Sequence, residues 1–410
     1  MKLYPLNELC IDVIDCPHST PEWLDEGITV IRNFNLNNGY LDFSKPSFVD
    51  EKTYKKRVKR AVPEAGDIVI SREAPMGVVA IIPEGLKCCL GQRLVLLKVD
   101  RSKCSPEYLL YALMSEYVQS QIKKVDKTGS IVSNLNIPDL KKLEIPVINE
   151  GQKEIAELLT NIDRMILINR DIQKDLQEII QTIFNQWFFQ YDFPDKNNKP
   201  YYTSGGEMTY YDEIDKWIPK GFDNKKISDF IRVSNKKTNP CDEPEKIFTH
   251  YSIPQYDKSG SYIKEKGGNI QSEKFVVSGK QILVSKLNPW FNRVVLPVDD
   301  INAIASTEFV VWEVENDSIR NFLYAIATHP HFIKYCTQKA TGTSNSHKRI
   351  KPESMIKYSF WADEEIIIRF GKLISPYIEE IKEVIAENRD LIQMKEFLMP
   401  LLMNEQIKFV

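Results

Sequence analysis

The chain has 410 residues, of which 42% are hydrophobic and 27% are charged, and its formal net charge is −3 at pH 7. This composition indicates a globular protein of two or three domains and excludes fibrous and disordered chains. No stretch has the length and apolarity of a transmembrane helix, and the first residues lack the apolar core of a signal peptide, so we expect a cytoplasmic protein. The seven cysteines and five histidines form no disulfide framework or zinc pattern, so we expect reduced thiols and no metal site.

The first half of the chain divides into a strand-rich unit, residues 1–149, and a long helix, residues 150–192. β-Branched residues with flanking glycines predict strands in the first unit at residues 28–32, 67–71, 78–82 and 94–99. A helix is predicted over 106–124, because Ser105 and Pro106 form a start signal. The long helix would extend over about 60 Å, which is the dimension of a spacer.

The second half repeats this order. A linker rich in Asn, Pro, Gly and Tyr covers residues 193–222, and a second strand-rich unit covers residues 223–361. A helix is predicted inside this unit near residues 317–338. A second long helix covers residues 362–410, and Pro400 is expected to break it near its end.

Three sequence anchors indicate a tandem duplication. Gly66 corresponds to Gly279 (279 − 66 = 213), and both glycines precede an apolar strand pattern. Two further segments, Leu110-Tyr111-Ala112 and Thr128-Gly129-Ser130, recur at the same offset as Leu323-Tyr324-Ala325 and Thr341-Gly342-Thr343. Because three anchors at one offset are hard to obtain by chance, the two strand-rich units are predicted to be copies of one unit.

The two long helices carry the same heptad pattern. Apolar residues alternate steps of four and three in both helices, at Ile155, Leu159, Ile162 and Ile166 and again at Ile374, Ile378, Ile381 and Ile385. Each series then reaches an asparagine, Asn169 in the first helix and Asn388 in the second. The simplest interpretation is that the helices pair with each other and that the asparagines fix their register, although such a seam could also pack against a sheet.

Local signatures resemble those of the specificity subunits of type I restriction–modification systems, and the resemblance covers essentially the whole chain. The segment that ends the family's central helix is similar to Asn185-Gln186-Trp187-Phe188-Phe189-Gln190-Tyr191-Asp192-Phe193-Pro194. The lead-in to the family's second target-recognition domain is similar to Gly205-Gly206-Glu207-Met208 and Ile218-Pro219-Lys220-Gly221-Phe222. The end of its first recognition domain is similar to Thr128-Gly129-Ser130, Leu143-Glu144-Ile145-Pro146-Val147 and Gln152, whereas the second copy lacks the matching proline and glutamine.

The resemblance implies an α+β fold in which two similar target-recognition domains are joined by two long antiparallel pairing helices. These helices form a coiled-coil spacer, and the chain is a pseudo-twofold tandem repeat. Each recognition domain of the family reads one half of a split target in double-stranded DNA, and the helices set the unread gap. The resemblance also implies partners, namely two methyltransferase subunits docked on the helices and two motor-nuclease subunits. Two similar but non-identical readers on one chain favour an asymmetric target.

The sequence contains no constellation that supports catalysis. Asn288-Pro289-Trp290-Phe291 is similar to the motif with which adenine amino-methyltransferases hold a flipped base, but Trp290 replaces the motif's second proline. No glycine-rich loop after a strand indicates an S-adenosylmethionine site, and a nuclease core and a phosphate-binding loop are also missing. We therefore expect a chain without catalytic activity or cofactor, in which this motif is a DNA-facing loop.

Three local excesses of positive charge favour nucleic acid despite the negative net charge. They cover residues 51–60, 119–142 and 333–351, although a single run of this kind is commonly a solvated face. Lys and Arg suit phosphates, whereas Arg, Asn, Gln and small hydroxyls suit base edges, so residues of these types are our candidates for DNA contact. In the first unit they are Arg32, Asn33, Asn35, Arg72, Lys127, Ser130 and Asn134. In the second unit they are Lys286, Asn288, Arg293, Thr343, Ser344, Asn345, His347, Lys348 and Arg349.

Two alternatives remain open at this point. The glycine in each of the two Thr-Gly segments would let the backbone approach a phosphate, but the same segments could be tight turns that cap a helix. The whole chain could also be an assembly scaffold, in which the long helices bind other proteins and degenerate globular units no longer read DNA. An adenine methyltransferase gene next to this one would favour the DNA-reading hypothesis.

Overall fold

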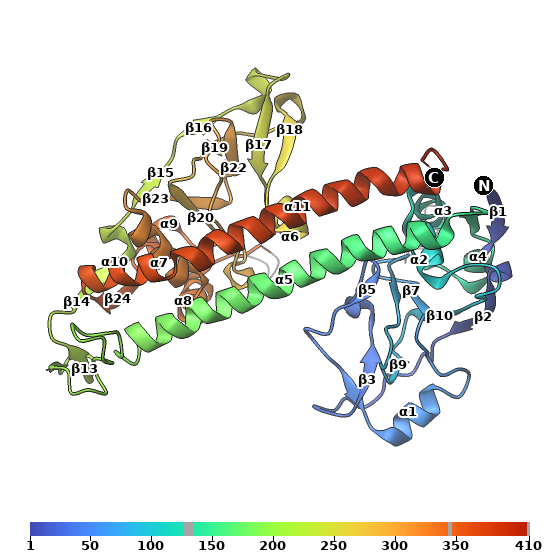
Figure 1. The fold of residues 1–410 in the computed structure, drawn as a ribbon, viewed down its shortest axis with the longest axis horizontal. Helices are drawn as coiled ribbons and strands as arrows, with labels where there is room; N and C mark the ends of the chain where they lie inside the picture. Colours follow the sequence, from blue (N-terminus) through green and yellow to red (C-terminus); the bar gives the residue numbers. More distant parts are fainter. Residues whose placement is uncertain (127–133, 343–346, 408–410) are drawn as a thin grey trace. The chain divides into compact units, whose positions relative to one another are not determined.

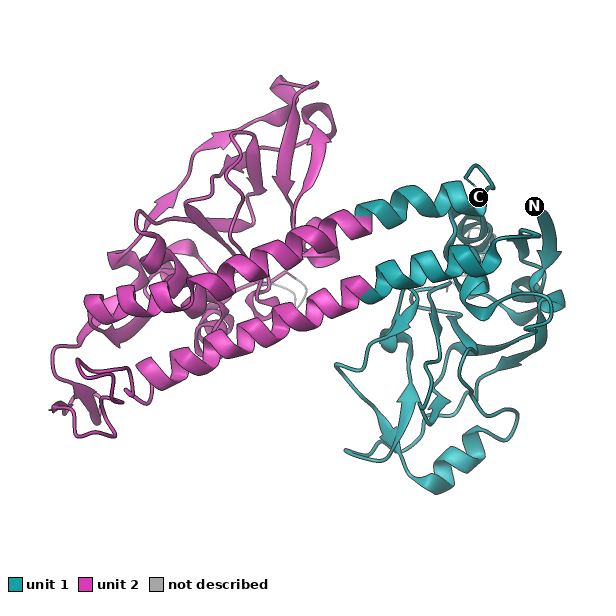
Figure 2. Cartoon of the chain, viewed as in Figure 1, with its two compact units in different colours: residues 1–164, 393–410 teal, residues 165–392 magenta. Residues whose placement is uncertain are grey.

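The computed structural model describes residues 1–126, 134–342 and 347–407. The chain divides into two compact units, one formed by residues 1–164 with 393–410 and the other by residues 165–392 (Figure 2). The boundary falls inside two long helices, so each unit combines a strand-rich part with segments of both helices.

The described residues of the first unit form three sheets that join distant segments of the chain, and one short hairpin. The central sheet has four antiparallel strands in the order β2-β10-β7-β8, formed by Cys10–Asp15, Leu94–Val99, Ile68–Ser71 and Val79–Ile81. A second sheet has the order β6-β3-β9, formed by Phe48–Val49, Ile28–Ile31 and Cys88–Leu90. The third pairs β1 with β11, which are Lys2–Pro5 and Glu144–Val147, and a short hairpin joins β4 (Leu36–Asn37) to β5 (Tyr40–Leu41). The four predicted strands are therefore confirmed as β3, β7, β8 and β10.

The helix predicted over residues 106–124 is in fact two helices, α2 (Pro106–Met114) and α3 (Glu116–Asp126). Ser115 separates them, because its backbone is extended and its hydroxyl donates to the carbonyl of Ala112. The same hydroxyl accepts a hydrogen bond from the N–H of Val118, so it caps the second helix. Two shorter helices in this unit are α1 (Glu51–Arg57) and α4 (Ile137–Lys141).

The second unit repeats this sheet topology. Its four-stranded sheet has the order β15-β23-β20-β21, formed by Arg232–Ser234, Phe309–Glu313, Gln281–Ser285 and Val294–Val295. A two-stranded sheet pairs β14 (Asp223–Lys226) with β24 (Ser359–Ala362). A five-stranded sheet has the order β16-β19-β22-β17-β18, formed by Lys237–Thr238, Lys274–Val276, Ala303–Ser306, Ile247–Tyr251 and Ile263–Lys266.

Strand pairing confirms the duplication expected from the three sequence anchors. β17 is parallel to β22 in the second unit, as β3 is parallel to β9 in the first. β18 is antiparallel to β17, as β6 is to β3. The four-stranded sheets also share their order of connections, so the two units are copies of one topology, and the sheet of β17 has two more strands than the sheet of β3.

The second unit also contains a broken helix at the corresponding place. The predicted helix near residues 317–338 is α7 (Asp317–Thr328) followed by α8 (Pro330–Lys339). His329 lies between them, and its Nδ1 accepts a hydrogen bond from the N–H of His331. Burial, with a smaller effect of His331, lowers the pKa of His329 to about 4, so this histidine is neutral at pH 7 and caps a helix. The remaining short helices are α6 (Ile253–Ser259) and α9 (Pro352–Met355).

Residues 193–222, expected as a linker, pack into the second unit. They include a hairpin of β12 (Met208–Tyr211) and β13 (Lys216–Pro219). Phe193, Ile218 and Phe222 are buried in the apolar core of this unit, and the rings of Phe193 and Phe222 are stacked with centroids 5.4 Å apart. The segment is therefore an ordered part of the second unit.

The first long helix is continuous, whereas the second is interrupted. α5 spans Gln152–Phe188, but the second helix is α10 (Glu364–Leu373) followed by α11 (Ser375–Met403). The interruption at Ile374 precedes Pro376, which has no N–H to continue the helical hydrogen bonds and is tolerated in the first turn of a helix. The break expected at Pro400 is wrong, because α11 continues through this proline to Met403.

α5 and α11 run antiparallel within each unit (Figure 1). In the first unit Ile155 and Leu159 share an apolar core with Leu402. In the second unit Ile180 shares a core with Ile374 and Ile378. The predicted pairing of the two heptad patterns is therefore confirmed in each unit.

Both asparagines of the heptad pattern are buried in the second unit and bond across the helix pair. The Asn169 side-chain amide donates to the Glu387 carboxylate at 2.9 Å, and the Asn388 amide donates to the Ile166 carbonyl at 3.3 Å. Such bonds are made in only one register of the helices, which supports the register role that we predict for Asn169 and Asn388.

The cysteines and the helices give two further checks on the sequence analysis. All seven cysteines are unpaired, and six of them are buried. Burial raises the pKa of the Cys88 thiol to about 12, with a smaller effect of Cys89, so this thiol is unreactive at neutral pH. None of the described helices is long and apolar enough to span a membrane.

The aromatic segment at the end of α5 anchors this helix in the second unit. Trp187 and Phe188 are buried and meet the ring of Phe370 edge-on, with centroids 5.7 and 5.3 Å away. Phe188 also contacts Phe322 of α7 at 4.9 Å. α5 is thereby joined to both α7 and α10, so the signature segment found in the sequence has a structural role.

This anchoring predicts a large stability difference between two tryptophans of the second unit. Trp187 is 5% exposed, whereas Trp217, in the hairpin, is 59% exposed. Trp187→Ala should cost about 3–5 kcal/mol and lower the midpoint of thermal unfolding by roughly 10 °C. Trp217→Ala serves as the control and should lower it by less than about 2 °C. Equal shifts in calorimetry would contradict the anchoring role of Trp187.

Candidate nucleic-acid interface

Both units contain the same pair of backbone hydrogen bonds at the candidate interface, and we call this pair the backbone frame. In the first unit the N–H of Arg72, just after β7, donates to the Arg93 carbonyl, and its own carbonyl accepts from Leu135. In the second unit Lys286, just after β20, makes the same two bonds with Glu308 and Ile350. Each frame therefore brings the end of a central strand beside the segment that follows the second helix of the broken pair.

Two candidates occupy equivalent places on this frame. Asn134 precedes Leu135 in the first unit, and Arg349 precedes Ile350 in the second. Both side chains are exposed. The frame thus presents a short amide in one unit and a long cation in the other. Five candidates, namely Lys127, Ser130, Thr343, Ser344 and Asn345, lie outside the described residues.

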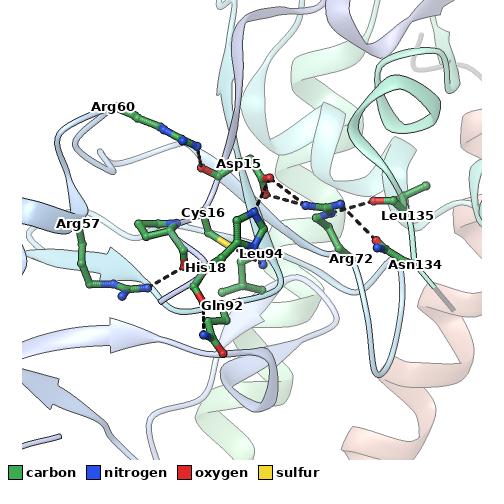
Figure 3. A network of polar contacts seen from close by, with 11 residues as sticks. Asp15, Cys16, His18, Arg57, Arg60, Arg72, Gln92, Leu94, Asn134 and Leu135 are labelled. Carbon is green, nitrogen blue, oxygen red and sulfur yellow. Dashed lines mark hydrogen bonds and ion pairs between the residues drawn. The ribbon is translucent and has the colours of Figure 1, made fainter. Parts of the chain in front are cut away.

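Arg72 is committed to contacts inside the first unit (Figure 3). Its Nη1 lies 2.9 Å from both carboxylate oxygens of Asp15, and its Nε donates to the Leu135 carbonyl at 3.0 Å. Its Nη2 donates to the side-chain oxygen of Asn134 at 3.3 Å. Only 12% of the Arg72 side chain is exposed. Arg72 therefore positions Asn134 and the frame, and it is poorly placed to contact DNA itself.

Arg32 differs from Arg72, because aromatic rings rather than a carboxylate surround it. Its guanidinium carbon lies 4.6 Å from the ring centroids of both Trp23 and Phe34. Arg32 is partly exposed, and within the described part of the chain its guanidinium is in no ion pair. The two rings restrict the orientation of the planar Arg32 guanidinium. The guanidinium remains available to an anion or to a guanine base.

The two asparagines that flank Phe34 hold the loop itself. Asn35 is buried, its side-chain oxygen accepts from the Arg32 N–H at 2.9 Å, and its amide donates to the Asp42 carbonyl at 2.8 Å. The amide of Asn33 donates to the Glu73 carbonyl at 2.5 Å. These bonds give both residues structural roles, and Asn35 has no exposed surface to offer a base.

In the second unit Arg293 and Asn288 are likewise structural. The buried Arg293 guanidinium makes a bidentate ion pair with Asp257, with distances of 2.6 and 2.9 Å. Asn288 is 8% exposed, and its side-chain oxygen accepts a hydrogen bond from the Lys348 N–H at 3.0 Å. An asparagine used in this way does not present its amide to a flipped adenine, which weighs against the methyltransferase interpretation of this segment.

The remaining candidates of the second unit lie at its surface. Arg349 makes a bidentate pair with Glu308 at 2.9 and 3.0 Å, and these hydrogen bonds raise the pKa of its guanidinium above the usual value. His347 is exposed, and Lys286 and Lys348 are partly exposed. Neither lysine is in an ion pair with any residue that the structure describes. These two lysines are therefore available to phosphates.

The exposed lysines of α1 form a basic face that is absent from the candidate residues predicted from the sequence. Asp50 caps this helix, and hydrogen bonds from Thr53 hold the pKa of its carboxyl below the usual value. Lys52, Lys55 and Lys56 are exposed on the helix. Arg57, by contrast, is buried and donates to the Leu90 carbonyl, so one cation of this run is structural. The cap signal and the helical spacing of the lysines could have identified this face.

Comparisons with known proteins place this fold. Residues 21–178 match the family model of the type I restriction modification DNA specificity domain. The MjaIX specificity subunit of Methanocaldococcus jannaschii is 30% identical over 207 residues, which are 50% of this chain and 44% of that subunit. The chain thus spans less than half the length of this relative. The HindI specificity subunit of Haemophilus influenzae is 23% identical over 443 residues, which cover 91% of this chain and 92% of that subunit.

A solved structure supports the fold over nearly the whole chain. The S subunit of a type I restriction–modification system from M. genitalium has a TM-score of 0.53 to this structure. The match covers 97% of this chain and 94% of that chain at 14% identity. The predicted fold class, two similar strand-rich units with long pairing helices, agrees with this likeness.

The contrast between two arginine pairs predicts different stability effects. Arg72→Ala leaves Asp15 without its partner in a site where the two side chains are 12% and 22% exposed, and it should cost about 3 kcal/mol. Arg349→Ala breaks a more exposed pair with Glu308 and should cost less than about 1 kcal/mol. Calorimetric unfolding without DNA measures both. If the two variants lose the same stability, the pair of Arg72 with Asp15 does not have the structural role described above.

Proposed function

We propose that this chain, which belongs to the specificity subunits of type I restriction–modification systems, reads a split target in double-stranded DNA with its two strand-rich units. The tandem repeat carries this proposal. Two copies of one sheet topology present the same backbone frame, and each frame can serve one half of a target. Two readers on one chain suit a duplex in which two short sequences are separated by unread base pairs.

The two half-sites are expected to differ in sequence. The frame carries Arg72 and Asn134 in the first unit, where the second unit has Lys286 and Arg349. An amide and a guanidinium recognise different base edges, because amides suit adenine and guanidinium suits guanine. A chain with unlike readers therefore recognises an asymmetric target, in contrast to the palindrome of a symmetric dimer.

Phosphate contacts are assigned to lysines around each frame. Lys286 and Lys348 in the second unit and the α1 lysines in the first are exposed or partly exposed cations. Such contacts orient a protein on the duplex without selecting its sequence. Asn134, Arg32, His347 and Arg349 remain as candidates for base edges. The paired helices are proposed to set the unread gap, with Asn169 and Asn388 fixing their register.

We further propose that an exposed apolar stripe on α5 docks the methyltransferase subunits. Met165, Ile168, Ile172 and Ile179 follow heptad spacing, and each is at least 36% exposed. They lie on a different face of α5 from the buried seam of Ile162 and Ile166. A second helical seam of this kind suits a partner helix. Two methyltransferase and two motor-nuclease subunits would supply the chemistry, and this chain would supply none.

The test is a selection from randomised duplex DNA, with the chain co-purified with the methyltransferase subunit of the same system. Two short fixed sequences separated by a constant gap are the expected result. A single contiguous sequence would mean that one unit does not read DNA. Recovery of no sequence from a folded, assembled sample would favour the alternative of an assembly scaffold with degenerate units.

Two variants should separate phosphate contact from base contact. Lys348→Ala should weaken binding of all sequences and reduce the slope of log K against log salt by about 0.9, since one phosphate contact is lost. Asn134→Ala should instead change the preferred base at one position of one half-site, at a cost of about 1–3 kcal/mol. Binding titrations at several salt concentrations and repeated selection measure these effects. Unchanged salt slope and unchanged target would refute both assignments.

The docking stripe predicts a loss of assembly without a loss of folding. Ile168→Asp combined with Ile172→Asp places two charges in the stripe and should weaken binding of the methyltransferase subunit at least about tenfold. Ile301→Asp is the control, because Ile301 is 94% exposed and lies outside the helices. Co-purification yield and circular dichroism give the readouts. Normal assembly of the folded double variant would remove the stripe from the interface.

A further inference from the structure

The loop between β20 and β21 presents two aromatic rings to solvent. Trp290 is 37% exposed and Phe291 is 58% exposed, and their ring centroids are 5.9 Å apart. Two neighbouring exposed aromatic rings offer a large apolar contact area to a partner. These rings belong to the motif Asn288-Pro289-Trp290-Phe291 noted in the sequence. They take no part in the backbone bonds at Lys286, so their role is not explained by the interface described above.

The loop is held rigidly below these rings. Asn288 exchanges two hydrogen bonds with Lys348, of 2.7 and 3.0 Å. Within the loop, the N–H of Phe291 donates to Asn288 and that of Asn292 donates to Pro289. Phe291 rests on the guanidinium of Arg293, 4.7 Å from its ring centroid, and Arg293 is itself fixed by Asp257. A rigid loop loses little conformational entropy when its rings meet a partner.

The surroundings of the two rings are positively charged. The loop, α8 and residues 347–351 together contain seven cations and no acidic residue. Asp257 and Glu308, from other segments, pair with Arg293 and Arg349. The five lysines of this set, namely Lys286, Lys334, Lys339, Lys348 and Lys351, are in no ion pair with described residues. This charge favours a polyanion as the partner of the rings.

Another exposed tryptophan in the same unit provides a contrast. Trp217 packs beside Tyr210 in the hairpin of β12 and β13, with ring centroids 5.2 Å apart. The turn of this hairpin contains Asp212, Glu213 and Asp215, so the rings there lie beside acidic side chains. Exposure of tryptophan is thus not specific to one surface, but exposure beside clustered lysines distinguishes the loop of Trp290.

We propose that Trp290 and Phe291 form an aromatic wedge that stacks on bases of the half-site bound by the second unit and unstacks one base step there. Apolar side chains inserted in this way partly separate neighbouring bases and bend the duplex. Flexible pyrimidine–purine steps open most readily, so the wedge adds selectivity at a step that no hydrogen bond reads. The inference rests on the proposed reading of DNA and adds deformation of the target to it.

The first unit lacks this wedge at the corresponding place. Its loop after β7 contains Ala74 and Pro75, and Ala74 has the same left-handed backbone as Asn288, with φ of 43° and 46° respectively. Ala74, Pro75 and the following Met76 carry no aromatic ring that could stack on a base. The two loops therefore begin with the same backbone bonds, at Arg72 and Lys286, and differ in the side chains that follow, so we expect aromatic stacking in one half-site only.

The experiment uses the complex with the methyltransferase subunit, bound to its selected target. Single adenines in each half-site are replaced by 2-aminopurine, whose fluorescence rises when stacking is lost, and dyes on the duplex ends report bending by energy transfer. Trp290→Ala combined with Phe291→Ala should abolish the rise at one step, reduce the bend, and weaken binding roughly 10- to 100-fold. Trp290→Phe in an otherwise unchanged chain should retain the signal. Trp217→Ala, the matched control, should leave all three readouts unchanged.

Three outcomes separate the explanations. A split target bound without any difference between the native chain and the double variant would overturn the wedge and leave the proposed function in place. Loss of the methyltransferase subunit from the double variant, with the DNA signals unchanged, would assign the rings to a protein partner and overturn the wedge. Absence of any split target in the selection would overturn the proposed function and the wedge together.

Discussion

The apolar seam between α5 and α11 is the interaction on which the rest of the structure depends. In the first unit Ile155 and Leu159 of α5 share a core with Leu402 of α11, and all three are at most 3% exposed. In the second unit Ile180 of α5 shares a core with Ile378 and Ile381 of α11, and these three are at most 2% exposed. Burial of such side chains is worth about 1.5–3 kcal/mol each, so the seam is a major source of stability in both units. Because a one-step slip would bury Asn169 and Asn388 against apolar side chains, the seam also selects one register. Within its own unit, each strand-rich part shares an apolar core with segments of both helices.

The sequence predicts those elements of the fold that have a periodic pattern of apolar residues. Alternating β-branched residues identified β3, β7, β8 and β10, and heptad spacing identified α5 almost to its ends. The break at Ser115 could not be predicted, because the apolar pattern continues across it and its capping bonds depend on local geometry. At His329 the following Pro330, which lies in the first turn of α8, was a local signal for the end of a helix. At Pro400 the prediction of a break was wrong, because α11 continues through this proline although proline usually ends a helix.

The candidate site was less predictable, because a polar residue type does not reveal its partner. Arg72 and Arg293 have the side chains expected of DNA contacts, but carboxylates far away in sequence, Asp15 and Asp257, hold them inside their units. Those pairs are 57 and 36 residues apart, and no local pattern joins them. Trp290 was noticed only as part of a motif for another chemistry. Its exposure beside clustered lysines became apparent only once α8 and residues 347–351 were placed.

A division between frame and surface follows from these findings. Arg72 and Lys286 tie their loops by the same pair of backbone bonds, which any side chain at those positions can make. Asn134, Arg349, Trp290 and Phe291 project from the frame and contribute little to the buried cores. Substitutions at such exposed positions usually change stability by less than about 0.5 kcal/mol. A fold of this kind can therefore change its exposed side chains while its core, its helix register and the apolar stripe on α5 stay the same.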